Sequence, residues 1–109
     1  MTPTPEPDLR ATIVARTRQV FPQLVRLLLF GSRARGDART DSDYDLLVVD
    51  PTVAPRAGRS VPLRLALRGL GASFDIVVLT PEEFAELQQS GASLAQGLLR
   101  EAVVLHETA

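Results

Sequence analysis

Three aspartates on two apolar segments are the residues of this sequence best suited to chemistry. Asp43 and Asp45 flank Tyr44 and lead directly into the apolar run 46–49 (L-L-V-V). Alternate side chains of a strand share one face, so we expect the two carboxylates to point one way and Tyr44 the other. Carboxylates this close repel each other unless a cation lies between them or water solvates both. The pair therefore predicts a cation site where a buried strand begins.

A turn suited to holding phosphate precedes this pair. The apolar run 25–30 (V-R-L-L-L-F) predicts a strand that ends at Gly31. Gly31 allows the main chain to approach a ligand closely, and Ser32 offers a hydroxyl that could also cap a short helix. Main-chain N–H groups at such a helix start attract anions, and Arg33 and Arg35 add positive charge. Taken alone, a Gly-Ser dipeptide is equally typical of an ordinary loop.

The third carboxylate, Asp75, is the only charged residue of another apolar segment, 73–79 (S-F-D-I-V-V-L). If this segment pairs beside the first aspartate strand, Asp75 joins Asp43 and Asp45 on one face. Oxygen ligands without Cys or His favour Mg²⁺ or Mn²⁺ over Zn²⁺. Three carboxylates can hold two such ions about 3.5–4 Å apart, and Asp75 could also accept a proton from the nucleophile. Without the upstream pair, Asp75 would be explained as a solvated residue at a sheet edge.

These residues together resemble a known superfamily. Gly31-Ser32, ten intervening residues, Asp43-x-Asp45 in an apolar strand and the later Asp75 resemble the DNA polymerase β-like nucleotidyltransferases. The stretch 31–48, G-S-R-A-R-G-D-A-R-T-D-S-D-Y-D-L-L-V, is similar to the minimal nucleotidyltransferases, or MNT proteins, which pair with HEPN proteins in toxin–antitoxin modules.

The resemblance implies a role for each of these residues. They map as follows: Gly31, Ser32 and Arg33 to the nucleotide-phosphate turn, and Asp43, Asp45 and Asp75 to the catalytic carboxylates that hold the metal. The implied reaction transfers AMP from ATP to a hydroxyl, with two Mg²⁺ ions, or Mn²⁺, as cofactors. In HEPN-paired members the acceptor is a tyrosine of the toxin, which AMP groups silence. The resemblance thus implies an antitoxin that is a protein adenylyltransferase.

Two other hypotheses stay open. One keeps the enzyme class but changes the acceptor to a small molecule such as an aminoglycoside, or to an RNA end. The net charge of −1 argues against direct nucleic-acid binding and so against the RNA end. The other hypothesis is a non-catalytic antitoxin that neutralises its partner by binding. The presence of three mutually repelling carboxylates argues against it.

Composition is compatible with one small domain. The 109 residues are 45% hydrophobic, and we expect a proline-rich arm at 1–7 followed by a single domain at 8–109. The absence of cysteine excludes disulfides and thiolate metal sites, and no apolar run approaches a membrane span. We therefore expect a soluble cytoplasmic protein without a membrane partner. A core this small makes a homo- or hetero-oligomer unsurprising.

The remaining pattern predicts an α/β fold, with a small mixed sheet of three to four strands flanked by helices. Helices are expected at 9–21 with Asp8 as cap, at 61–70, after Thr80, and at 93–101. A last short strand is expected at 103–105. The strand-helix-strand order over 44–79 predicts parallel strands there, whereas the resemblance suggests a mixed sheet. Loop 52–60, with Arg56 and Arg59, is expected to be solvated, and leucines of the two C-terminal helices are candidate partner contacts.

Overall fold

The computed structural model describes residues 9–36, 42–91 and 93–108 of the chain. The expected arm at 1–7, the expected cap residue Asp8, and Arg39, a further basic residue close in sequence to Gly31-Ser32, all lie outside these residues. Within them, no helix is both long enough and apolar enough to cross a membrane.

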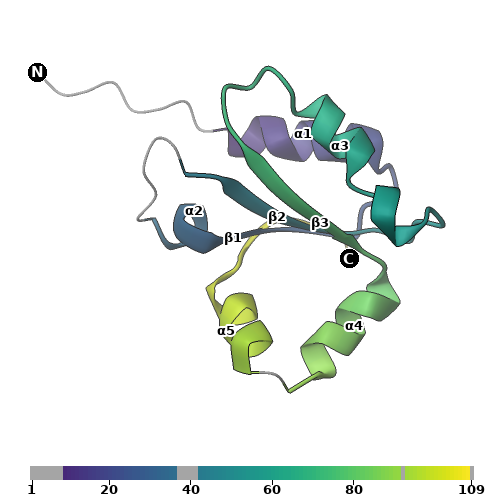
Figure 1. Cartoon of the computed structure of the whole chain (residues 1–109), viewed down its shortest axis with the longest axis vertical. Helices are drawn as coiled ribbons and strands as arrows, with labels where there is room; N and C mark the ends of the chain where they lie inside the picture. Colours follow the sequence, from purple (N-terminus) through teal and green to yellow (C-terminus); the bar gives the residue numbers. More distant parts are fainter. Residues whose placement is uncertain (1–8, 37–41, 92, 109) are drawn as a thin grey trace, which may run out of the picture.

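A four-stranded mixed sheet forms the centre of the molecule (Figure 1). Its strands are β1 (Arg26–Phe30), β2 (Tyr44–Val49), β3 (Phe74–Leu79) and β4 (Val103–Glu107). In space they follow the order β3-β2-β1-β4. β1 pairs antiparallel with β2 and with β4, whereas β2 and β3 run parallel. The expected mixed sheet and the expected parallel pairing of the two aspartate strands are both confirmed.

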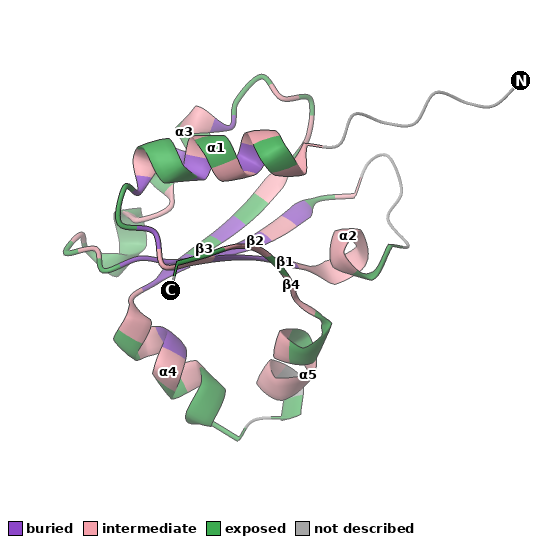
Figure 2. Ribbon diagram, turned by 180° about the vertical axis from the view of Figure 1, so that it is seen from behind, coloured by how far each residue is buried: buried purple, intermediate pink, exposed green. Residues whose placement is uncertain are grey.

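Helices cover both faces of this sheet. They are α1 (Arg10–Val20), α2 (Gly31–Arg35), the 3₁₀ helix η1 (Arg56–Gly58), α3 (Val61–Ala66), α4 (Pro81–Gln89) and α5 (Ser93–Glu101). Figures 1 and 2 show α1 and α3 together on one face, and α4 and α5 on the other. The short helix α2 follows directly from the end of β1. The site residues predicted from the sequence lie just before β2 and at its start, on β3, and in α2 directly after β1.

Two hydrophobic clusters lie on opposite faces of the sheet, because successive residues of each strand point to alternate faces. Ile13 of α1 and Leu63 of α3 pack in the first cluster with every second strand residue. Those strand residues are Leu27, Leu29, Tyr44, Leu46, Val48, Ile76 and Val78. The second cluster joins Phe84 of α4 to the intervening residues Leu28, Leu47, Val49 and Leu79. Figure 2 shows the buried residues concentrated on the strands and on the inner side of α1. The face of any strand residue can therefore be read from its position.

The sequence predicted a helix over 61–70, but α3 ends at Ala66. The chain then turns, and Arg68 donates its main-chain N–H to the carbonyl of Leu65 at 3.3 Å. Gly69 and Gly71 both have positive φ, at 85° and 77°, which a right-handed helix cannot accommodate. Because the helical periodicity of the leucines continues past Ala66, the sequence pattern alone extended the helix too far.

α4 confirms the helix expected after Thr80, and Thr80 caps it. Thr80 accepts a hydrogen bond from the Glu83 main-chain N–H at 3.2 Å, and the Glu83 carboxylate accepts one from the Thr80 N–H at 2.8 Å. The same carboxylate lies 2.6 Å from the Arg59 guanidinium and 3.5 Å from that of Arg56. Arg59 also donates to the carbonyl of Ala54 at 2.9 Å, so loop 52–60 is bound to α4 through this arginine rather than simply solvated.

These contacts make Glu83 a test of acid stability. Hydrogen bonding to the Thr80 main chain, and then to Arg59, lowers the pKa of Glu83 to about 2. A carboxyl whose pKa is lower in the folded state stabilises the fold above its unfolded pKa and loses that effect as pH falls towards 2. Glu83→Gln keeps an acceptor oxygen for the cap but loses the charge. We expect a lower unfolding temperature at pH 7 and no difference from wild type near pH 2, in thermal melts across this range.

Candidate functional site

The structure brings Asp45 and Asp75 side by side on adjacent strands. Asp45 is the second residue of β2, and its register partner on the parallel strand β3 is Asp75. Leu47 and Leu79, further along the same strands on the same alternation, pack in the cluster beneath α4. Both carboxylates therefore belong to the α4/α5 face of the sheet, and Asp43, directly before β2, shares that alternation. The expected common face is thus present in the fold.

Electrostatic coupling connects the three carboxylates. The pKa of Asp45 is raised above its ordinary value, first by burial and then by the negative charges of Asp75 and Asp43. Asp43 and Asp75 are exposed, whereas Asp45 is partly buried between strand and turn. A positive charge placed among them would relieve this repulsion and favour the ionised form of Asp45.

The donor set suits a hard divalent cation, although the side chains do not converge on a single point. Among the residues that the structure describes, no group of three or more His, Cys, Asp or Glu lies close enough together to hold a metal ion. Carboxylate oxygens without nitrogen or sulfur ligands nonetheless match Mg²⁺ or Mn²⁺. Because Asp43 and Asp75 are exposed, their side chains are free to turn towards Asp45. The metal role of all three stays a prediction.

The turn at Gly31, which the sequence predicts to hold phosphate, lies directly against Asp45. Phe30, the last residue of β1, is the register partner of Asp45, and Gly31 follows it with φ of 73°. A Cβ built on Gly31 would overlap the Oδ2 atom of Asp45. Glycine is therefore required here for two reasons: the backbone conformation is left-handed, and the Asp45 carboxylate occupies the space that a Cβ would need. This contact fixes the main chain of the turn beside the carboxylates.

Ser32 does not cap the short helix, contrary to expectation. α2 begins at Gly31 itself, its N-cap residue is Phe30, and no side chain bonds to the cap. Because Gly31 can adopt the unusual conformation that turns the chain out of β1, the helix starts two residues earlier than a Ser32 cap would place it. The first N–H groups of a helix have no partners within it. The N–H groups of Gly31, Ser32 and Arg33 belong to this first turn.

The Arg33 guanidinium lies away from the carboxylates. It donates to the Ser42 carbonyl through Nε at 3.2 Å and through Nη2 at 3.0 Å, and its central carbon lies 4.3 Å from the centre of the Tyr44 ring. Tyr44 belongs to the cluster under α1 and α3, on the face opposite the carboxylates. Arg35, the second expected cation, lies 3.5 Å from Glu101 of α5. The sequence placed both arginines near the turn but did not indicate these contacts.

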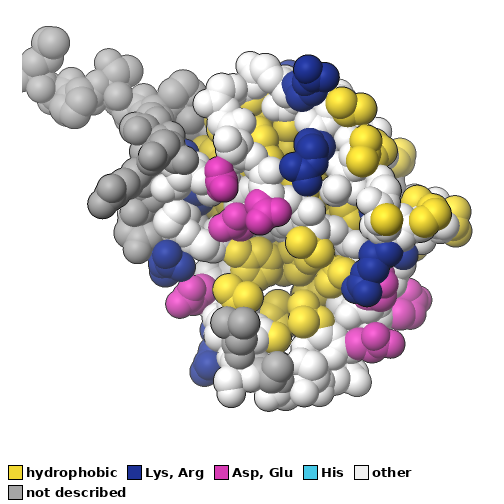
Figure 3. Space-filling model, in the orientation of Figure 1, with side chains coloured by type: hydrophobic (Ala, Val, Ile, Leu, Met, Phe, Trp, Pro, Cys, Tyr) yellow, Lys and Arg dark blue, Asp and Glu magenta, His cyan; other side chains and the backbone are white. Residues whose placement is uncertain are grey.

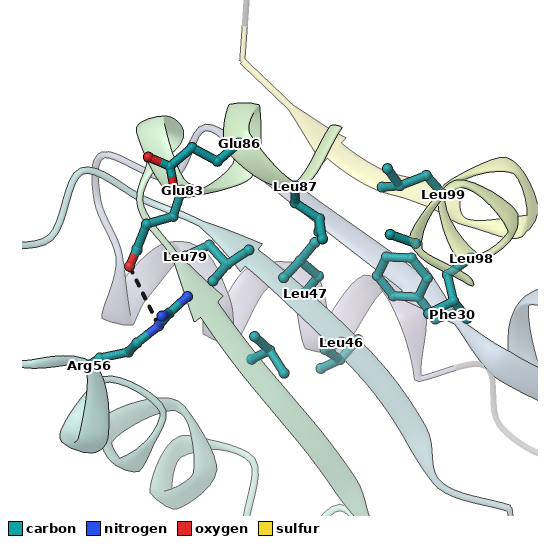
Figure 4. A pocket seen from close by; sticks show the side chains of 12 residues that line it. Phe30, Leu46, Leu47, Arg56, Leu79, Glu83, Glu86, Leu87, Leu98 and Leu99 are labelled. Atoms are coloured by element: carbon teal, nitrogen blue, oxygen red, sulfur yellow. Dashed lines mark ion pairs between the residues drawn. The ribbon is translucent and has the colours of Figure 1, made fainter. Parts of the chain in front are cut away.

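An apolar cavity of about 760 Å³ opens beside the carboxylates, between the sheet and the helices α4 and α5. On the sheet side it is lined by Phe30, the register partner of Asp45, and by Leu47 and Val77, which lie two residues beyond Asp45 and Asp75 on the same face. Leucines from both helices, Leu87, Leu98 and Leu99, line its other walls (Figure 4). Figure 3 shows hydrophobic side chains gathered around a hollow in this region, with acidic side chains above them. The volume is typical of a small-molecule site.

Comparison with known proteins gives one family. Residues 11–106 match the family model described as a nucleotidyltransferase domain. A solved structure described as a minimal nucleotidyltransferase is 35% identical, with a TM-score of 0.58, and the match covers 86% of each chain. No curated protein gives a significant sequence match. The chain therefore belongs to the nucleotidyltransferase domain family and, within it, to the minimal nucleotidyltransferases.

Two toxin–antitoxin structures share the fold at lower identity. A crystal structure of a toxin–antitoxin with AMP-PNP is 22% identical with a TM-score of 0.67, covering 91% of this chain and 73% of that one. A complex of a tri-AMPylated HEPN toxin from Shewanella oneidensis with its MNT antitoxin is also 22% identical, with a TM-score of 0.59, and covers 91% and 70%.

Proposed function

We propose that this nucleotidyltransferase is a Mg²⁺-dependent protein adenylyltransferase, which transfers AMP from ATP to a tyrosine hydroxyl of a HEPN toxin and thereby acts as its antitoxin. The observation that carries the proposal is the register of Asp45 with Asp75, against a glycine turn that contacts Asp45. The turn proposed to bind phosphate and the carboxylates proposed to bind the cation thus lie next to each other at one end of the sheet.

Each part of the site has a separate task in this proposal. The main-chain N–H groups of Gly31, Ser32 and Arg33, with the Ser32 hydroxyl, hold the phosphates. Asp43, Asp45 and Asp75 hold two Mg²⁺ ions, for which Mn²⁺ can substitute. When bound, the ions neutralise the triphosphate and lower the pKa of the acceptor hydroxyl.

The transfer itself is a displacement at the α-phosphorus. The acceptor oxygen forms a bond to this phosphorus while the bond to the bridging oxygen breaks, and pyrophosphate leaves with that electron pair. Asp75, exposed at the edge strand β3, accepts the proton of the hydroxyl. The product is an AMP ester of the acceptor.

The cavity beside the carboxylates supports an aromatic acceptor. Arg56, Glu83 and Glu86 belong to the lining, but most of it is apolar and would desolvate the several ammonium groups of an aminoglycoside at high cost. A tyrosine ring matches walls formed by Phe30, Leu47 and Leu99 and can carry its hydroxyl towards Asp45 and Asp75. The AMPylated HEPN toxin bound to a structural relative supports the same acceptor class.

The experiment that tests this function offers one labelled donor to three acceptors. The purified chain is incubated with Mg²⁺ and ATP labelled at the α-phosphate, together with a HEPN protein, an aminoglycoside, or RNA. We expect label on a tyrosine of the HEPN protein alone. Label on the aminoglycoside or RNA would assign a different acceptor. A stable HEPN complex without label would instead support neutralisation by binding.

A further inference from the structure

A stack of three side chains lies on the sheet face opposite the carboxylates. The Arg33 guanidinium covers the Tyr44 ring at 4.3 Å, and the Tyr44 ring stacks on that of Phe74, with centroids 5.5 Å apart and an interplanar angle of 26°. Tyr44 is buried, at 6% exposure, and Arg33 and Phe74 are partly buried. We call these three residues the rear stack.

Each member of the rear stack is next in sequence to a member of the proposed site. Arg33 follows Ser32 of the phosphate turn, and Tyr44 lies between Asp43 and Asp45. Phe74 precedes Asp75 and is the register partner of Tyr44. Since neighbouring strand residues point to opposite faces, a side chain held at the rear fixes its neighbours at the front. The stack thus connects the three segments that carry the site.

Arg33 also contacts the residues directly before and after Asp43 in the sequence. Its guanidinium makes two hydrogen bonds to the carbonyl of Ser42, the residue before Asp43, and contacts the ring of Tyr44, the residue after it. A planar guanidinium can stack on a ring and donate sideways from its edge at the same time, which a lysine ammonium cannot do. On the other side, Arg10 of α1 donates to the Arg33 carbonyl at 3.3 Å, which ties the turn to the helix layer.

From this geometry we propose that Arg33, Tyr44 and Phe74 are positioning residues, which set the spacing between the phosphate turn and the three carboxylates. The proposal rests on the proposed function for its kinetic consequence. It assigns the Arg33 side chain to holding Asp43 in place, while the main chain of the same residue stays in the turn. The rear stack should therefore control how well the carboxylates gather around a divalent cation.

The test measures metal affinity, nucleotide affinity and turnover in Arg33→Lys and Phe74→Leu. Second-layer substitutions of metal sites typically cost about 10–100-fold in metal affinity or activity. We expect Mn²⁺ affinity, followed by electron paramagnetic resonance, and kcat to fall by a factor in this range. The ATP dissociation constant without metal should stay unchanged, because phosphate contacts come from the main chain of the turn.

The integrity of the stack can be followed separately. The chain has one tyrosine and no tryptophan, so its near-ultraviolet circular dichroism around 280 nm reports on Tyr44. We expect this signal to weaken in Arg33→Lys and Phe74→Leu in parallel with Mn²⁺ affinity. Tyr44→Phe retains the ring and should retain Mn²⁺ affinity and kcat.

A matched control is Arg16→Lys. Arg16 donates to the Ala66 carbonyl at 2.6 Å and joins α1 to α3 on the same side of the sheet, without touching the stack. We expect its Mn²⁺ affinity and kcat to remain those of wild type. If Arg33→Lys raises the ATP dissociation constant with Mn²⁺ affinity unchanged, Arg33 is a phosphate ligand and the inference is wrong.

Unchanged Mn²⁺ affinity in both stack variants would also overturn the inference. Failure of the proposed function would give a different result: the wild-type protein would transfer no AMP. The Mn²⁺ affinities of wild type and variants could still be compared in that case. Arg33→Lys is the decisive variant, since it preserves the charge and most of the side-chain volume and leaves the rings of Tyr44 and Phe74 unchanged.

Discussion

Asp45→Asn is expected to lower AMP transfer by at least about 10³-fold, the upper range for loss of one group that stabilises a transition state. The same change should slightly raise the unfolding temperature at pH 7. Burial and the charges of Asp75 and Asp43 raise the pKa of Asp45, so the ionised carboxylate destabilises the fold and a neutral amide relieves the repulsion. Activity and stability therefore move in opposite directions. Initial rates and thermal melts on one preparation measure both.

The pH dependence of this effect has a defined sign. A carboxyl whose pKa is higher in the folded state favours folding below its unfolded value, which is 3.8 here, and loses that effect as pH rises through the folded value. The stability advantage of Asp45→Asn should thus be largest near neutral pH and disappear below pH 3.8. Melts at several pH values check this.

Asp50 offers a matched control just past the other end of β2. It is 6% exposed, its side-chain Oδ1 has no hydrogen-bond partner among the residues that the structure describes, and its pKa is raised by burial. Five residues of strand place it about 16 Å from Asp45. Asp50→Asn should also stabilise the fold at pH 7, yet leave AMP transfer intact. If Asp45→Asn keeps normal transfer, or if Asp50→Asn loses it, the assignment of the site is wrong.

Gly31→Ala should have the second large effect. The new Cβ would overlap the Asp45 Oδ2 atom, so either the turn or the carboxylate must move. A left-handed conformation costs a residue with a Cβ a further ~1–2 kcal/mol. We expect a lower unfolding temperature and a loss of transfer comparable to that of Asp45→Asn, because the displacement separates the phosphate turn from the carboxylates.

Gly36→Ala separates the backbone cost of a left-handed conformation from the effect of the contact with Asp45. Gly36 ends α2 with φ of 85°, and a Cβ there meets no atom of the described residues within 4 Å. Its backbone cost should therefore match that of Gly31→Ala, while the contact with Asp45 remains undisturbed. We expect a similar loss of stability with most of the transfer activity retained. Equal loss of transfer in both variants would show that the contact with Asp45 is unimportant.

The carboxylate positions were predictable because the relevant rules are local. Two-residue alternation places Asp43 and Asp45 on one face, and the crossover between β2 and β3 requires a parallel pair. The sequence pattern did not give the register of β2 with β3. Because each aspartate lies near the start of its apolar run, pairing of the two strands was expected to bring Asp75 close to Asp45. The fold class followed from the same strand and helix signals.

The rear stack could not be predicted, because it depends on which way one long side chain turns. Arg33 was expected near phosphates from its position beside Gly31-Ser32. In the fold the helix α2 directs its guanidinium towards Ser42 and Tyr44 instead. The alternation that assigned Tyr44 to the opposite face was the available signal. Nothing in the spacing shows that a cation covers this ring.

Two further features depended on tertiary contacts. Arg59 was expected in a solvated loop, but Glu83 of α4, far along the chain, binds it. The cavity beside the carboxylates arises because α4 and α5 stand apart over the sheet (Figure 1), and helix periodicity alone contains no information on that separation.

Direct measurement of divalent-metal binding tests the central claim most sharply. The claim is that Asp43, Asp45 and Asp75 together hold the cation needed for nucleotidyl transfer. Mn²⁺ is titrated into the purified chain and the free ion is followed by electron paramagnetic resonance, with Mg²⁺ as competitor. We predict saturable binding that Mg²⁺ displaces, that is lost in Asp45→Asn and Asp75→Asn, and that persists in Asp50→Asn. Equal Mn²⁺ binding by all four proteins would contradict the account.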